Sequence, residues 1–208
     1  MSVFDKDVWS KYQDVIGGIE SGNRYNIFGG ANDHYDGRYQ LGRDAKIDAG
    51  NALGIDLSHT PEAREAFRSD PKLQDDAFRA YTEQNHKTLS RLSPEYKSLS
   101  PEEQLAVLGY AHNQGAGGAL NWLRSGVAGK DAFGTSGTKY SNALSNIFGN
   151  VQNVGKSLGT GVQNLFTPGS SSPSRDSSSP RTNPKTTSTV STDSDFFKHW
   201  DSRHNKKP

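Results

Sequence analysis

The composition of the chain changes sharply near residue 150, and this change limits what can fold. Residues 1–150 contain 16 Lys and Arg against 19 Asp and Glu, whereas residues 151–208 contain 8 against 4. Residues 167–194 are mostly Ser, Thr and Pro, a composition that cannot bury enough apolar surface to form a core. We therefore expect one folded domain over residues 1–148, followed by an extension.

The expected domain carries helical patterns with clear start and stop signals. Apolar residues recur at helical spacing over residues 8–19, and Gly22 ends that pattern. Residues 70–71 (Asp-Pro) open a second helix, and residues 100–103 (Ser-Pro-Glu-Glu) have the pattern of a capping box with Pro at the first helical position. Shorter helices are expected at 44–53, 61–68, 118–126 and 138–148.

Residues 23–42 break the helical pattern. They are rich in Gly, Asn and Asp, which favour turns or a short hairpin. The predicted fold is therefore mainly α, with a short turn-rich hairpin segment. Because this segment follows a helix directly and carries aromatic and acidic residues, it is a candidate wall of a cleft, and a plain structural connector is the alternative.

Several kinds of chemistry are disfavoured by the sequence. The chain has no cysteine, which excludes disulfides and thiolate metal sites, and its six histidines show no metal-ligand spacing. It contains no nucleophile elbow and no phosphate-binding loop, and residues 115–118 (Gly-Ala-Gly-Gly) are interpreted as a helix-ending turn. The net charge of +1 gives no argument for nucleic acid as a partner. We expect no metal, no organic cofactor and no nucleic acid.

Glu20 is the candidate for acid chemistry. Cleavage of a glycosidic bond requires a carboxylic acid that protonates the leaving oxygen. Glu20 lies at the predicted end of the first helix, where the partial negative charge of the helix terminus disfavours a second negative charge. Partial burial beside the aromatic-rich segment would act in the same direction. A solvated helix-end carboxylate is the alternative interpretation.

Four short motifs resemble those of one superfamily. Residues 19–23 (Ile-Glu-Ser-Gly-Asn) resemble the E-S-G motif of soluble lytic transglycosylases and goose-type lysozymes. Residues 37–41 (Gly-Arg-Tyr-Gln-Leu) resemble the G-L-M-Q motif, and more closely the G-R-Y-Q-L of lambda-type phage endolysins. Residues 111–115 resemble A-Y-N-A-G, from which His112 and Gln114 depart, and residues 138–140 resemble a T-x-x-Y segment. Their order and approximate spacing match, so the chain resembles the lysozyme-like superfamily.

This resemblance implies a fold and residue roles. The fold would be a lysozyme-like (α+β) domain, and Glu20 would act first as general acid and then as base. Ser21 and Gln40 would hydrogen-bond the sugar or position the acid. Asn113 and Tyr140 would hold the N-acetylmuramic acid ring and orient Glu20, and Tyr39 would pack beneath a sugar. Ordinary core or rim packing is the alternative for Tyr39 and Tyr140.

A second carboxylate would separate two outcomes. A hydrolase uses one as nucleophile or to position water, and the candidates in the right stretch are Asp33, Asp36 and Asp44. The resemblance implies that a lytic transglycosylase needs a single acid/base, because the muramic 6-hydroxyl attacks and gives a 1,6-anhydro product. The three aspartates do not match cleanly, and turn-rich segments use Asp for capping. The sequence therefore favours the transglycosylase, and a lysozyme-type hydrolase stays open.

The extension predicts how such an enzyme is used. Residues 149–166 continue an apolar face that begins at residue 146 and could dock on a partner or a membrane surface, residues 167–194 form a tether, and residues 195–208 form an aromatic-basic anchoring peptide. We expect residues 146–208 to bind other proteins of a phage virion, in the tail or internal core, where the chain would be homo-oligomeric and would open the wall during genome ejection.

The N-terminal residues carry charges where a signal peptide needs an apolar run, so we expect synthesis in the host cytoplasm and action at the bacterial cell wall. Two other hypotheses remain. One is a virion structural or peptidoglycan-binding protein on a lysozyme fold that no longer catalyses a reaction, which the departures at His112 and Gln114 would allow. The other is a free endolysin that is released at lysis.

Overall fold

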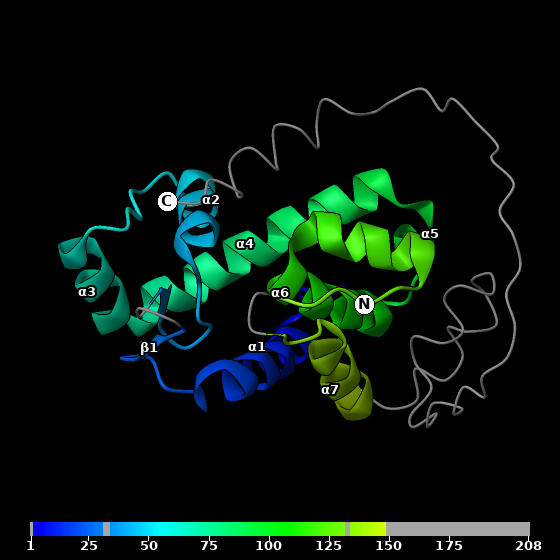
Figure 1. The fold of residues 1–208 in the computed structure, drawn as a ribbon, viewed down its shortest axis with the longest axis horizontal. Coiled ribbons are helices and arrows are strands. Elements are labelled where there is room, and N and C mark those ends of the chain that lie inside the picture. The colour runs from blue at the N-terminus through cyan, green and yellow to red at the C-terminus, as the bar shows by residue number, and fades with distance from the viewer. Residues whose placement is uncertain (1, 31–33, 132–133, 149–208) are drawn as a thin grey trace, which may run out of the picture. The chain divides into compact units, whose positions relative to one another are not determined.

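The computed structural model describes residues 2–30, 34–131 and 134–148, which form a mainly α-helical structure with one small antiparallel sheet (Figure 1). Its helices are α1 (Lys6–Ser21), α2 (Arg43–Leu53), α3 (Pro61–Ser69), α4 (Pro71–Leu92), α5 (Pro94–Lys97), α6 (Pro101–Ser125) and α7 (Thr138–Phe148). Strands β1 (Phe28–Gly29) and β2 (Tyr35–Asp36) pair between α1 and α2. The predicted mainly α class with a short hairpin is confirmed. The predicted docking segment, tether and anchoring peptide (149–208) lie outside the described residues.

The helix ends lie where the sequence places its signals. Gly22 ends α1 in the left-handed conformation, with φ of 64°. The Asp70 carboxylate accepts a hydrogen bond from the amide of Leu73 at the start of α4, at 2.9 Å. At the start of α6, Ser100 and Glu103 form both hydrogen bonds of the predicted capping box. Each cap satisfies backbone groups that the helix itself leaves unpaired. The residues that form it lie within a few positions of the helix end, so these ends depend on local sequence.

A kink divides α6. The predicted short helix at 118–126 is part of this longer element, which continues past Gly115 at φ 70° and ψ 169°. Glycine adopts such a conformation readily because it has no Cβ. The predicted turn is therefore present at Gly115, but residues 116–118, which were assigned to it, are helical. The kink ends the first part of α6 directly after Asn113 and Gln114, and so leaves these two side chains at the end of a helix.

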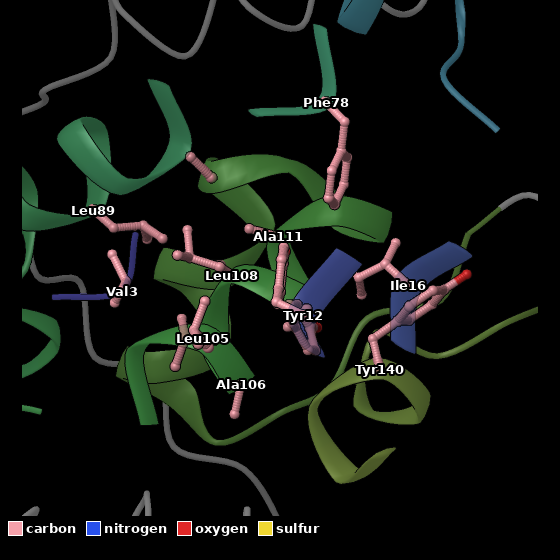
Figure 2. Packing of buried hydrophobic residues seen from close by; sticks show 14 of the residues in the cluster. Val3, Tyr12, Ile16, Phe78, Leu89, Leu105, Ala106, Leu108, Ala111 and Tyr140 are labelled. Atoms are coloured by element: carbon pink, nitrogen blue, oxygen red, sulfur yellow. The ribbon is translucent and has the colours of Figure 1, made fainter. Parts of the chain in front are cut away.

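The core joins the segments that carry the motifs. The helices α2 and α3 pack against α4, and α4 packs beside α6 (Figure 1). Figure 2 shows buried side chains converging from several helices: Tyr12 and Ile16 from α1, Phe78 and Leu89 from α4, Leu105, Leu108 and Ala111 from α6, and Tyr140 from α7. Each of these side chains is nearly inaccessible to solvent. The shared core thereby fixes α1, α6 and α7 relative to one another.

Candidate active site

One cleft of about 370 Å³ is lined by segments that are far apart in the sequence. Among its residues are Glu20 near the end of α1, Gln40 after the hairpin, Asn113 at the end of the first part of α6, and Tyr140 on α7. These are four of the six residues to which the resemblance assigns a role. The other two, Ser21 and Tyr39, are not among the residues that line this cleft.

Glu20 is contacted by groups on two other helices. Its side chain is 17% exposed, and its Oε1 lies 3.1 Å from Nε2 of His112. Burial raises the pKa of the Tyr140 phenol. The negative charge of Glu20 and a hydrogen bond with its carboxylate raise this pKa further. The Tyr140 hydroxyl therefore keeps its proton and can donate toward Glu20. The candidate acid thus faces the cleft from a partly buried position.

Ser21 holds the end of α1 against the hairpin segment. Its hydroxyl is buried and donates to the backbone oxygen of Arg38 at 2.8 Å. The Arg38 guanidinium in turn donates to Asn23 Oδ1 at 3.0 Å and to Asp14 Oδ1 at 2.6 Å. The sequence left two roles open for Ser21, and these contacts favour positioning the helix end that carries Glu20 over contact with a sugar.

Tyr39 is a core residue, so the expectation that it packs beneath a sugar is wrong. Its side chain is 1% exposed, and its ring stacks on Phe78 with centroids 3.9 Å apart. Its hydroxyl donates to Asp75 Oδ1 at 2.6 Å and accepts from Gln13 Nε2 at 3.1 Å. The alternative of ordinary packing, which the sequence also allowed, holds for this residue.

Gln40 lines the cleft in an unusual backbone conformation. Its φ is 46°, a value that costs a residue other than glycine roughly 1 kcal/mol or more. Its amide Nε2 donates to the backbone oxygen of Gly37 at 2.8 Å, which fixes the side chain. Gly29 leaves room for this arrangement, because a Cβ at that position would lie 1.6 Å from Gln40 Oε1.

Gly29→Ala is therefore expected to displace the Gln40 side chain. The backbone at Gly29 does not have positive φ, so alanine fits the local conformation. We expect the thermal midpoint to stay close to that of the wild type and any activity of the cleft to fall about tenfold or more. Combining Gly29→Ala with Gln40→Ala tests the cause, because both changes remove the same group. An additive loss in the double variant would contradict this account.

Asp36 is not a candidate second carboxylate, and the expectation for it is wrong. It is fully buried and forms ion pairs with Lys46, with Arg64 at 3.0 Å and with Arg68 at 2.8 Å. Burial alone would raise the pKa of Asp36, but hydrogen bonds from Arg64 and Lys46 outweigh it and hold the pKa below its ordinary value. Asp36 therefore ties the hairpin to α2 and α3 and does not face a substrate.

Among the described residues, Asp131 is the carboxylate that lines the cleft together with Glu20, and the sequence analysis missed it. Its Oδ2 accepts a hydrogen bond from Asn113 Nδ2 at 2.9 Å, and its Oδ1 accepts one from the Thr135 amide at 2.8 Å. Asp44 is exposed in the first turn of α2 and is not among the cleft residues, and Asp33 lies outside the described residues. Asp131 falls between the third and fourth motifs, so no motif could have indicated it.

Phe28 was also missed and adds an apolar surface to the cleft. It lies in strand β1, and 47% of its surface is exposed. The guanidinium carbon of Arg68 lies 3.7 Å from the centroid of its ring. Such a cation–π contact orients the ring, so the cleft has an exposed aromatic surface beside its polar side chains.

Over residues 2–30, 34–131 and 134–148, no three acidic or histidine side chains come together as a metal ion would require. The helices in these ranges also lack the combination of length and apolar character that crossing a membrane demands. Comparison of the chain with protein-family models, with curated proteins and with solved structures gives no match.

Proposed function

We propose that the chain cleaves the β-1,4 bond between N-acetylmuramic acid and N-acetylglucosamine in peptidoglycan, on a lysozyme-like fold and with Glu20 as the general acid. One observation carries the proposal. Glu20, Gln40, Asn113 and Tyr140 come from four separate motifs, and all four line the same cleft. Motifs that match by chance would have no reason to converge on one cleft.

The favoured reaction is lytic transglycosylation. The Glu20 carboxyl gives its proton to the oxygen that leaves with N-acetylglucosamine, as the bond from that oxygen to C1 of the muramic residue breaks. The 6-hydroxyl of the same muramic residue then bonds to C1, and the Glu20 carboxylate takes the hydroxyl proton. The product is a 1,6-anhydro ring, no water is consumed, and Glu20 returns to its starting state.

Hydrolysis is the second candidate, and the position of Asp131 favours it. A cleft with two carboxylates can use one as acid and the other as base for a water molecule. Asp131 is held by Asn113 and Thr135, which would keep its carboxylate in a fixed place beside a bound sugar. In that case the product would carry a reducing end.

Asp131→Asn separates these two reactions. For a transglycosylase we expect 1,6-anhydro ends from both wild type and variant, with release of soluble fragments from purified sacculi slowed less than about tenfold, because only the support of Asn113 changes. A hydrolase would give reducing ends, and the variant would lose about 100-fold or more of its rate. If the full chain releases no fragments from sacculi of several wall types, the proposed function is wrong.

We further propose that this activity belongs to a phage particle and acts during genome ejection. The support is the composition of residues 149–208, which combines an apolar segment, a Ser/Thr/Pro-rich tether and an aromatic-basic end. These residues lie outside the part of the chain that the structure describes, so this part of the proposal rests on sequence alone.

A further inference from the structure

His112 is fixed directly beside the candidate acid. Its side chain is 5% exposed, and its Nε2 lies 3.1 Å from Glu20 Oε1. The imidazole ring meets the ring of Phe78 edge-on, with centroids 5.5 Å apart, and lies 5.9 Å from the ring of Tyr140. Packing against these two rings restricts rotation of the imidazole, so the fold holds His112 in contact with Glu20.

The surroundings of the ring indicate which nitrogen carries the proton. His112 Nδ1 is buried and has no hydrogen-bond partner among the residues that the structure describes. Buried N–H groups without an acceptor are rarer in proteins than buried acceptors without a donor, so a bare ring nitrogen suits this position better than a protonated one. The proton of the neutral imidazole therefore belongs on Nε2, where Glu20 Oε1 accepts it.

We propose that His112 is a positioning residue that donates a hydrogen bond from Nε2 to Glu20 Oε1 in both protonation states of the acid. This inference rests on the proposed function. A proton on Oε1 would need Nε2 as its acceptor and would force the imidazole proton onto the buried Nδ1. The proton that Glu20 gives and takes back therefore resides on Oε2, and His112 selects that oxygen.

Three variants of His112 separate the hydrogen bond from the packing. His112→Phe keeps a flat ring among the aromatic neighbours but has no donor. His112→Gln loses the ring but places an amide nitrogen as far from the backbone as Nε2. His112→Asn carries the same amide one bond closer to the backbone and serves as the matched control for reach.

We expect kcat for fragment release to fall about tenfold to 100-fold in the Phe and Asn variants, with KM little changed. The Gln variant should stay within about fivefold of the wild type. The thermal midpoints should follow a different order, with Phe above Gln, because stability depends on the ring. If activity instead follows stability, with Phe retaining more activity than Gln, His112 acts by packing and the proposal is overturned.

A second measurement does not depend on activity. A long-range ¹H–¹⁵N spectrum of the full ¹⁵N-labelled chain, with His112→Gln to assign the signals, reports which ring nitrogen carries the proton. For the neutral imidazole we expect a protonated Nε2 and a bare Nδ1. A neutral imidazole with its proton on Nδ1 overturns the role of His112 even if the wild type cleaves peptidoglycan. An inactive wild type with the expected tautomer instead overturns the proposed function.

Discussion

Replacing Glu20 by glutamine is expected to lower the rate of fragment release from dye-labelled sacculi by about 1,000-fold. Glutamine has nearly the same shape, and its side-chain oxygen can still accept the hydrogen bond from His112. It cannot give a proton to the leaving oxygen, so only the acid function is removed. Because Glu20 is partly exposed in the cleft, we expect the variant to fold with a thermal midpoint close to that of the wild type.

Glu62→Gln is the matched control for this change. Glu62 is exposed in the first turn of α3 and is not among the cleft residues, so its loss should leave the rate unchanged. A folded Glu20→Gln protein that keeps more than about a tenth of the wild-type rate would contradict the assignment of the acid.

The second large effect concerns stability. Asp36→Asn is expected to lower the free energy of unfolding by about 3–5 kcal/mol, because it leaves Lys46, Arg64 and Arg68 without their shared anion in the interior. Asp56→Asn, at an exposed position, is the control and should change it by less than about 0.5 kcal/mol. Urea unfolding at neutral pH measures both differences, and equal midpoints for wild type and Asp36→Asn would contradict the role of this cluster.

The same cluster predicts a dependence on pH. The pKa of Asp36 in the folded chain lies below its value in the unfolded chain, so its contribution to stability is present above the unfolded value, about 4, and is lost as the pH falls through the folded value. The difference in stability between wild type and Asp36→Asn should therefore shrink on acidification below about pH 4. A difference that stays constant down to strongly acidic pH would show that the charge of Asp36 is not the cause.

The helix ends could be predicted from the sequence because their causes are local. The capping box at Ser100 and the left-handed Gly22 each depend on a few adjacent residues. The helix over residues 118–126 was also predicted, but the helical conformation of residues 116 and 117, which were assigned to a turn, could not be predicted in this way. The residues after the kink are held by tertiary packing, with Ala119, Leu120 and Trp122 buried in the core, and this packing outweighs a glycine-rich local sequence.

The candidate site could be predicted only where a motif marks it. The motif residue Gln40 lines the cleft, whereas its neighbour Tyr39 is buried in the core. From the sequence, Asp36 was a candidate for the second carboxylate. In the structure it forms ion pairs with three cationic side chains. Asp131 has no motif, and the fold alone brings it to Asn113. Exposure and partners arise from tertiary contacts, which a local pattern does not contain.

The central claim is tested most directly by mass spectrometry of purified peptidoglycan after incubation with the wild type and with Glu20→Gln. The account predicts fragments with 1,6-anhydromuramic ends from the wild type and none from the variant. Fragments with reducing ends, absent from the variant, would keep Glu20 as the acid and change the reaction to hydrolysis. The same fragments from both proteins, or none from either, would contradict the claim that Glu20 in this cleft cleaves the glycan.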